Sequence, residues 1–336
     1  AAWASRYTRT VRAVSDTGLV MAIDSSPKPS RPALIALGSP AARNSRFLTN
    51  AGPAITDVRH WPVLPAANQA LTVSARIEDP DGLAQAIIKY RVDPSSNYVS
   101  VPLNNNGAGL FSGAIPGQAT GARVAFYIET RDAFTPSTVA RFPGDAPVRE
   151  CLISFGESTP AGNFATYRLW VSQRNVTRWA TREKLSNHPL DATFVYGGVR
   201  VCYNVNTLYS GSPFHSPGYN SPDGNACDYE VNFALDDQLL GTDDFVLGTI
   251  GNLHSDPTYQ AEQTALWISR KLGTPYLHRR SIRLLFNGQQ RGVLYEDAQQ
   301  PNGAVVNEFF PDDDAGSLHK IEDWFEFNDA GDSMLG

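Results

Sequence analysis

Two charged side chains in the C-terminal half of the chain are the best candidates for chemistry. Glu262 lies beside the apolar face of a helix expected over Asp256 to Lys271, where a carboxylate can pair with a cation on a neighbouring strand. Arg200 is the only lysine or arginine between Leu185 and Ser269. It could bind a phosphate or pair with Glu262. The alternative is that both are ordinary solvated surface charges.

The surroundings of Arg200 in the sequence are strongly acidic. The same interval holds ten carboxylates: Asp191, Asp223, Asp228, Glu230, Asp236, Asp237, Asp243, Asp244, Asp256 and Glu262. A triphosphate needs cations or backbone N–H groups around it. A nucleotide bound in this region would therefore depend on Arg200, loop amides and a metal ion.

Other site patterns fare less well. The acidic turns Asp79-Pro-Asp-Gly82 and Asp312-Asp-Asp314 could supply oxygens to Ca²⁺, but neither has the spacing of an EF-hand. The histidines and cysteines lack the spacing of a zinc site, and the sequence has no G-x-S-x-G elbow and no Walker lysine. Hydrolase and P-loop functions are therefore disfavoured.

The elements that must position Glu262 are a helix and the hairpin after it. Asp256 is expected to be the N-cap, Pro257 to occupy the first turn and Gly273 to end the helix. One narrow apolar face is predicted from Ala261, Thr264, Ala265, Ile268 and Leu272. In the stretch Ser281 to Asp297, the dipeptide Asn287-Gly288 predicts a two-residue type I′ turn, because both positions need positive φ.

In this order the motifs resemble a known family. They are similar to motifs of the spore-coat protein H (CotH) family of atypical kinases. The residues that carry this resemblance are Asp256-Pro-Thr-Tyr, then Glu262, Lys271-Leu-Gly273 and Pro275, and then Leu285-Phe-Asn-Gly-Gln-Gln-Arg-Gly-Val-Leu-Tyr-Glu296. The resemblance covers about residues 155 to 336. It implies a kinase-like fold, ATP with Mg²⁺ or Mn²⁺, and phosphotransfer to hydroxyl groups of a protein substrate.

The resemblance also implies roles for individual residues. Glu262 matches the family's helix glutamate, and Arg200 an early strand arginine. Tyr295 and Glu296 match the strand that leads to the nucleotide hinge, and Asn287, Gly288 and Gly292 match the turn before it. The family's helix arginine is replaced by Ala261, and its lysine-rich strand reads Cys227-Asp-Tyr-Glu-Val231 here. Its catalytic base and metal-binding acids are expected beyond Gly336, so this chain would hold an incomplete kinase N-lobe that is inactive alone.

Upstream of this region the pattern is that of an all-β module. Short alternating runs separated by turn residues predict a fibronectin type III or immunoglobulin-like β-sandwich over residues 51–155, a spacer or docking module. The expected strands are Ala54 to His60, Leu71 to Glu78, Ile87 to Asp93, Leu110 to Ile115, Arg123 to Thr130 and Thr138 to Phe142.

The kinase-like region, residues 156–336, is expected to be α+β. It has predicted strands at Phe164 to Val171 and Asp228 to Leu235, a short helix or turn at Val176 to Leu185, and a strand pair within Thr193 to Asn204. Ser210 to Ala226 is a long loop, a kind that is usually functional or mobile. Residues 1–50 are expected to be a linker or the remnant of a preceding β module, with strands plausible at Tyr7 to Val14 and Gly18 to Ile23.

Composition limits the class of protein. The chain has 336 residues, a net charge of −6 and no block of lysine or arginine, so nucleic-acid binding has little electrostatic basis. No apolar run is long enough to span a bilayer. The abundance of Gly and Pro favours turn-rich β structure. Of the three cysteines, Cys202 and Cys227 could form a disulfide, which is weakly favoured and leaves Cys151 over.

Two functions of different classes follow. The first is an exported bacterial surface or coat protein with a CotH-like kinase domain, read as a fragment of something longer. The second is a degenerate kinase fold that acts at the cell surface as a non-catalytic structural or interaction module, with Ca²⁺ or a protein partner at its acidic face. Carbohydrate binding by the sandwich is a thin third option, because Trp61 is its only tryptophan.

Overall fold

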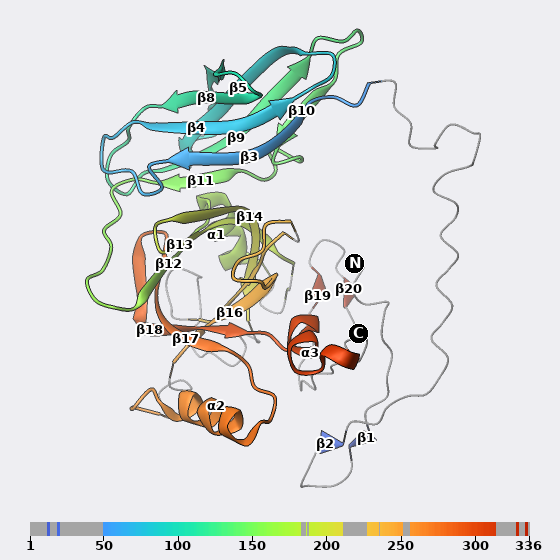
Figure 1. Ribbon diagram of the computed structural model, residues 1–336. Coiled ribbons are helices and arrows are strands. Elements are labelled where there is room, and N and C mark those ends of the chain that lie inside the picture. The colour runs from blue at the N-terminus through green and yellow to red at the C-terminus, as the bar shows by residue number, and fades with distance from the viewer. Residues whose placement is uncertain are drawn as a thin grey trace, which may run out of the picture. The chain divides into compact units, whose positions relative to one another are not determined.

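The computed structural model describes residues 50–182, 186, 188–210, 227–234, 236–250 and 256–313, and two short strand pairs. These pairs are β1 (Arg12–Ala13) with β2 (Leu19–Val20), and β19 (Phe327–Asn328) with β20 (Ser333–Met334). By its contacts the chain divides into one unit of Ala1–Ala51 with Pro301–Glu322 and a second of Gly52–Gln300 with Asp323–Gly336. The structure is mostly β, as expected from the sequence (Figure 1).

Two antiparallel sheets form the first part of the second unit (Figure 1). One has the order β3-β4-β8-β7, and the other has the order β10-β9-β5-β6, with β11 also paired to β9. The strands are β3 (Ala54–Trp61), β4 (Leu71–Glu78), β5 (Leu83–Asp93), β6 (Val99–Pro102), β7 (Asn104–Asn105), β8 (Leu110–Ile115), β9 (Arg123–Asp132), β10 (Val139–Phe142) and β11 (Cys151–Ser154).

Alternating side chains of both sheets meet in one core. In β4 every second residue is buried, which is the period-2 pattern that predicted this strand. The core takes in side chains from β4, β5, β8, β9 and β11, so the two sheets pack face to face as a sandwich. All six predicted strands are present, while β6, β7 and β11 were missed. In β11 all four residues are buried, and a strand covered on both faces has no alternation to detect.

Seven further strands close into a barrel in the order β12-β13-β14-β15-β16-β18-β17 (Figure 1). All neighbours are antiparallel except β12 and β17, whose parallel pairing closes the ring. The strands are β12 (Ala165–Trp170), β13 (Leu190–Tyr196), β14 (Arg200–Tyr209), β15 (Tyr229–Asn232), β16 (Asp244–Thr249), β17 (Arg279–Phe286) and β18 (Gln289–Gln299). Strand β16 was not among the predicted elements.

The barrel interior is filled with aromatic side chains, and helix α1 (Gln173–Thr181) contributes to it. Val176 and Trp179 of α1 join the core, and the Trp179 ring lies 4.8 Å from the ring of Tyr209, centroid to centroid. Ser172 caps the helix by accepting a hydrogen bond from the backbone N–H of Asn175. The predicted short helix is thus confirmed, although it ends at Thr181 rather than Leu185.

Helix α2 (Ala261–Leu272) begins later than predicted. Its N-cap is Gln260, not Asp256, and the expected start is wrong. The Asp256 carboxylate accepts hydrogen bonds from the N–H groups of Thr258, Gln260 and Ala261, which closes a separate turn before the helix. Tyr259 adopts a φ of 56° in that turn, and such a residue interrupts a right-handed helix. The predicted end is confirmed, because Gly273 is left-handed with a φ of 70°.

The predicted hairpin is confirmed as β17 and β18. Asn287 and Gly288 have φ values of 50° and 83°, as a type I′ turn requires. The Asn287 side chain also donates to the carbonyl of Val171 and accepts from its N–H, at 3.0 and 2.9 Å. The turn is therefore fastened to the end of β12, the strand that closes the barrel.

The weakly favoured disulfide is not formed. Cys202 and Cys227 are free, buried thiols, as is Cys151. In the ladder between β14 and β15, Tyr209 pairs with Tyr229 and Asn206 with Asn232. Cys227 therefore lies near the Tyr209 end of β14, whereas Cys202 lies near the other end. Cys202 is seven residues from Tyr209, so at about 3.3 Å per residue the two cysteines are more than about 20 Å apart along the strand, far beyond the span of a disulfide.

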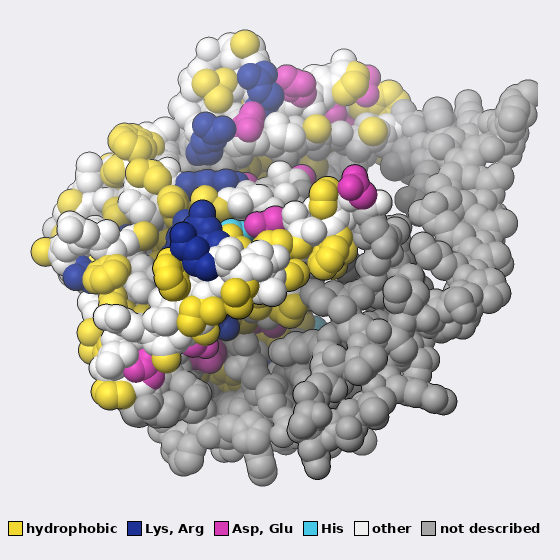
Figure 2. Space-filling view, turned by 60° about the horizontal axis from the view of Figure 1, so that its bottom comes forward, with side chains coloured by type: hydrophobic (Ala, Val, Ile, Leu, Met, Phe, Trp, Pro, Cys, Tyr) yellow, Lys and Arg dark blue, Asp and Glu magenta, His cyan; other side chains and the backbone are white. Residues whose placement is uncertain are grey.

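Outside these two β structures, the described residues include helix α3 (Gly303–Phe309) and the 3₁₀ turn η2 (Pro311–Asp313). Asp312 falls in that turn, whereas Asp314 and residues 211–226 of the predicted loop lie outside the described residues. On the face of the molecule drawn in Figure 2, basic side chains occur in small groups beside acidic, apolar and uncharged ones.

Candidate functional site

The structure places Glu262 and Glu296 around one shared cation, Arg279. Arg279 is the first residue of β17, and its Nη1 lies 3.0 Å from Glu262 Oε1 and 3.1 Å from Glu296 Oε2. Glu262 belongs to the first turn of α2 and Glu296 to β18. The Glu296 side chain is buried, whereas that of Glu262 is 45% exposed. The helix carboxylate therefore does pair with a strand cation, and that cation is Arg279 rather than Arg200.

A second contact joins the helix to the same carboxylate. Gln263 donates from Nε2 to Oε1 of Glu296 at 2.8 Å. Among the described residues, the polar side-chain contacts of α2 with the barrel strands, one from Glu262 and one from Gln263, therefore converge on Arg279 and Glu296. None of the residues of α2 is buried. The position of this helix on the barrel thus depends largely on polar contacts around one buried carboxylate.

A third carboxylate, Asp228, lies just before β15 and adds negative charge to the cluster. Its Oδ1 accepts hydrogen bonds from the N–H and hydroxyl of Thr249 at 2.7 and 3.0 Å. Burial raises the pKa of Asp228, and the bonds from Thr249 and the charge of Arg279 oppose that shift. Burial is also the main reason that the pKa of Glu262 is raised. The charge of Arg279 lowers this pKa, and the neighbouring Glu296 raises it further. Three carboxylates therefore share one nearby arginine.

Arg200 lies in a different place. It begins β14 and donates from Nη2 to Asp237 Oδ1 and to the carbonyl of Gln238, both at 2.7 Å. The hydrogen bond to Asp237 is the main cause that raises the pKa of Arg200. Arg200 thus fastens the segment between β15 and β16 to β14. Glu262 has its partner elsewhere, so the pairing of Arg200 with Glu262 considered from the sequence is wrong.

Tyr295 points into the barrel rather than toward the cluster. It is fully buried in the core, and its hydroxyl donates to the carbonyl of Cys227 at 3.0 Å. Because successive residues of a strand point to opposite faces, Tyr295 faces inward and Glu296 faces outward toward α2. Of the four residues selected from the sequence, the structure brings only Glu262 and Glu296 together.

The strand before α2 contains no cation. Strand β16 reads Asp-Phe-Val-Leu-Gly-Thr from residue 244, and Gly248 pairs with Glu296 in the ladder. A Cβ atom built on Gly248 would meet nothing closer than Val246 Cγ1 at 3.8 Å and Asp228 at 3.9 Å. The position therefore has room for a side chain directed toward the acidic cluster.

Arg279 and Gln263 were not among the residues selected from the sequence. Arg279 stands next to Arg280 at the start of a strand, and either could have been the partner of Glu262. Alternation along β17 decides between them, because Arg280 Nη2 donates to Tyr167 in the barrel core while Arg279 faces α2. The spacing contained a usable signal. Glu262 lies in the first turn of α2, and the short connection after this helix leads to Arg279 at the start of β17, which can bring the chain back toward the first turn.

The cluster can hold a positively charged group more readily than an anion, because its carboxylates outnumber the arginine. Within the described part of the chain, no group of three His, Cys, Asp or Glu side chains has the geometry of a metal site. Arg279 could still align a phosphate, since a guanidinium has five N–H donors and can bind a further acceptor along an edge that its carboxylate partners leave open.

No helix among the described residues is long and apolar enough to cross a membrane. Comparison of the chain with models of known protein families finds no match, and comparison with curated proteins finds no significant relative.

Proposed function

We propose that the barrel carries the small, nucleotide-binding lobe of a CotH-type protein kinase in an exported bacterial surface or coat protein. Its reaction would be transfer of a phosphoryl group from ATP, with Mg²⁺ or Mn²⁺, to a Ser or Thr hydroxyl of a protein. The observation that carries the proposal is the ion pair between Glu262 of α2 and Arg279 of β17. Kinases depend on such an ion pair between a helix glutamate and a strand cation to organise the nucleotide site.

The connectivity of the barrel supports the proposal. Five of its strands follow the order β14-β15-β16-β18-β17, and α2 connects β16 to β17. In the proposed lobe, α2 would be the helix between the third and fourth strands, and β18 would be the fifth strand, which lies between these two in the sheet. The long connection between β14 and β15 then corresponds to the loop that covers the phosphates, and the end of β18 at Gln299 to the hinge. This is an argument from fold, and it bears on function by analogy.

One difference separates this lobe from an ordinary kinase. The third strand of a kinase small lobe bears the lysine of the ion pair, whereas β16 has Gly248 on the face toward Glu296. Arg279 replaces that lysine from the neighbouring part of the sheet and contacts two carboxylates at once. In the proposed lobe Arg279 holds α2 in place, and metal-bound phosphates would meet it beside Asp228 and Glu262.

The same difference favours a second candidate function. If both carboxylates keep Arg279 fully engaged, the cluster has no cation left for a nucleotide, and the fold would act as a non-catalytic module that binds Ca²⁺ or a protein partner at the cell surface. The exposed apolar side chains of α2, Trp267, Ile268 and Leu272, would then be available to a protein partner.

Thermal unfolding of this chain separates the two functions. ATP with Mg²⁺ or Mn²⁺ should raise Tm if the lobe binds nucleotide, since a ligand at about 100 times its Kd stabilises by about 2.7 kcal/mol. Arg279→Gln should abolish that shift, while Arg59→Gln, a change to an exposed arginine of the sandwich, should preserve it. No shift with nucleotide but a shift with Ca²⁺ would reject the kinase and support the non-catalytic module.

A gain-of-function variant tests the correspondence of β16. Gly248→Lys would place an ammonium group at the position of the kinase lysine, near Asp228 and Glu296, where there is room for it. If the correspondence is right, this variant should bind ATP with Mg²⁺ more tightly than the parent chain, and the matched variant Gly248→Met should not. Equal affinities of both variants would count against the proposed lobe.

A further inference from the structure

The sandwich and the barrel meet in a buried junction that contains two unusual ionisable groups. Tyr203 of β14 leaves the barrel surface and inserts into the sandwich core, while Leu152 of β11 packs against Trp170 and Val195 of the barrel. The backbone N–H of Leu152 donates to the Thr193 hydroxyl at 2.9 Å. A spacer module would share only a small interface with its neighbour. Here the sandwich and the barrel are packed together through buried side chains.

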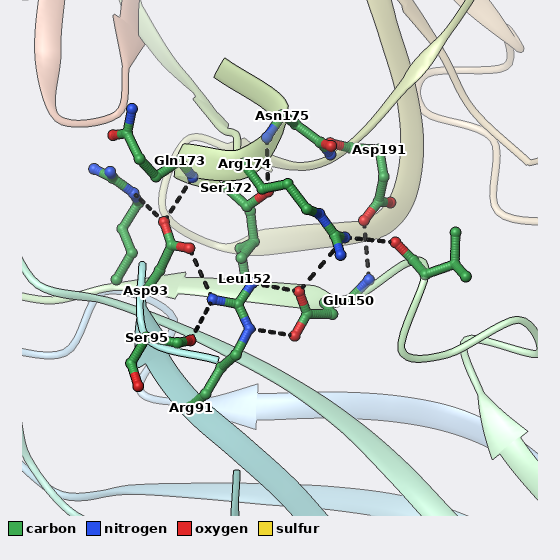
Figure 3. Close-up of polar contacts among 12 residues, drawn as sticks. Arg91, Asp93, Ser95, Glu150, Leu152, Ser172, Gln173, Arg174, Asn175 and Asp191 are labelled. Atoms are coloured by element: carbon green, nitrogen blue, oxygen red, sulfur yellow. Dashed lines mark hydrogen bonds and ion pairs between the residues drawn. The ribbon is translucent and has the colours of Figure 1, made fainter. Parts of the chain in front are cut away.

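A polar network adjoins the apolar contacts (Figure 3). Arg91 of β5 forms a two-pronged pair with Glu150, at 2.8 and 2.5 Å, and also donates to Asp93. Asp93 in turn accepts from the backbone N–H of Gln173, in the first turn of α1, at 2.7 Å. Arg123 also lies 3.8 Å from Asp93 and Arg174 lies 3.9 Å from Glu150, so both carboxylates have cations beside them.

Asp191 of β13 belongs to the same region but lacks such compensation. Its Oδ2 accepts one hydrogen bond, from the backbone N–H of Glu150 at 2.9 Å, and its buried Oδ1 has no hydrogen-bond partner among the described residues (Figure 3). A carboxylate placed in this way loses most of its hydration, so the neutral acid is favoured. Burial accordingly raises the pKa of Asp191 to about 7.

The charged groups around Asp191 come from the segment before β11 and from helix α1. Arg149 opposes the upward shift of its pKa, whereas Glu150 and Asp145 add to it. Arg174 of α1 donates to the carbonyl of Val148 and lies 3.9 Å from Glu150. Burial raises the pKa of the adjacent Cys151 thiol well above its usual value, so that thiol stays neutral.

His60 of β3 is the second unusual group, and it is held as a neutral imidazole. Its Nε2 lies 3.0 Å from the carbonyl of Val63, which can only accept, so this nitrogen carries the hydrogen. Its Nδ1 then accepts from the hydroxyl of Tyr203. Among the described residues no carboxylate is hydrogen-bonded to the ring. Burial lowers the pKa of His60 to about 4, and it raises that of Tyr203 well above 10, so Tyr203 keeps its proton.

We propose that His60 and Asp191 form a compensating pair that keeps the sandwich and the barrel docked with nearly constant strength from about pH 4 to pH 6.5. Closing the junction makes both groups neutral, His60 by loss of a proton and Asp191 by gain of one. The two proton changes cancel over the range in which both groups are ionised in the unfolded chain.

The signs of the two effects are opposite. The pKa of His60 is lower in the folded protein than its ordinary value of 6.5, so its contribution to stability is present above 6.5 and is lost as pH falls toward 4. The pKa of Asp191 is higher than its ordinary value of 3.8, so its contribution is present below 3.8 and is lost as pH rises toward 7. Each group alone changes the folding equilibrium constant by up to about tenfold per pH unit.

The test compares urea unfolding from pH 4.5 to pH 8 in the parent chain and in single and double variants. Relative to the parent chain, Asp191→Asn should gain stability as pH rises from 4.5 to 6.5, by up to about tenfold in equilibrium constant per pH unit. His60→Gln should lose stability over the same range by a similar factor. The double variant should follow the parent profile.

Two control variants account for general effects of charge. Asp57→Asn changes an exposed carboxylate of the sandwich, and His278→Gln changes an exposed histidine just before β17. Both should retain the parent profile. Single variants at positions 60 and 191 with parallel profiles, or with slopes of the reverse sign, would overturn the proposal.

Direct titration of the parent chain covers the case in which a variant does not fold. In NMR spectra with ¹³C-labelled histidine and aspartate, the His60 ring should stay neutral at pH 5.5 and the Asp191 carboxyl should still be protonated at pH 5.5. A charged His60 or an ionised Asp191 at that pH would reject the compensating pair.

Discussion

Helices α1 and α2 are attached to the same barrel in opposite ways. Helix α1 inserts Val176 and Trp179 into the barrel core, so it is held by apolar burial. Helix α2 buries no residue, and its exposed side chains include Trp267 and Leu272, at 59% and 73% of their surface. Its polar contacts to the barrel strands converge on Arg279 and Glu296.

Helix α1 is therefore part of the barrel core, whereas α2 is attached to the barrel surface by polar contacts. Apolar burial contributes about 25 cal/mol per Å², whereas a half-exposed ion pair contributes about 1 kcal/mol or less. Helix α2 can therefore leave its position at small cost. In the proposed kinase lobe the helix glutamate belongs to the element that is free to move.

The largest difference in stability is expected when one tryptophan on each helix is replaced by alanine. Trp179→Ala should destabilise the chain by about 3–5 kcal/mol, because it leaves a cavity among Tyr209, Tyr229 and Phe286. Trp267→Ala should change stability by less than about 0.5 kcal/mol, because that ring is largely in solvent. Urea unfolding measures both. Similar losses for the two variants would show that α2 is packed in solution.

The N-terminal ends of the two helices give the next test. Asp93, a sandwich residue with a buried side chain, accepts from the Gln173 N–H in the first turn of α1. Among the described residues, Asp256 instead accepts from groups that follow it closely in sequence. Asp93→Asn should cost about 1–3 kcal/mol, because Arg91 and the helix N–H lose a charged acceptor.

Asp256→Asn is the matched control. It should leave the global unfolding midpoint unchanged and raise amide hydrogen exchange only around the start of α2. The Asp256 pKa is lowered to about 2, first by its hydrogen bond from Thr258, so any effect of this side chain disappears only in strong acid. A global loss of stability in this variant would mean that the turn before α2 supports the whole barrel.

The same contrast explains how far the sequence could predict the fold. Local signals held where neighbours along the chain decide the structure: the alternation of β4, the Asn287-Gly288 turn and the Gly273 cap. The apolar face of α2 was also a real pattern, but the structure turns most of it toward solvent. Periodicity shows that a helix has two faces, and it does not show which neighbour covers either one.

Non-local pairing was beyond the reach of the sequence. Closure of the barrel depends on the parallel ladder of β12 and β17, whose residues are more than 100 positions apart. The choice of Arg279 over Arg200 as the partner of Glu262 depends on that closure, because it fixes which residues of β17 face α2. The buried junction was missed for a similar reason: Tyr203 reads as an ordinary strand tyrosine until the sandwich covers it.

Glu262→Gln tests the attachment of α2 without removing a buried side chain. Glu262→Gln removes the ion pair with Arg279 but leaves Arg279 bonded to Glu296. Since the Glu262 side chain is 45% exposed, the loss in unfolding free energy should stay below about 1 kcal/mol. Hydrogen exchange should nevertheless quicken along α2 and stay unchanged along α1, which is the signature of an attached element that loosens while the fold persists.

Gln238→Glu, on the segment that Arg200 fastens, is a matched control that alters charge away from α2. If Glu262→Gln instead lowered the global midpoint as much as Trp179→Ala, α2 would be integral to the barrel, and the pair Glu262–Arg279 would be explained by folding alone.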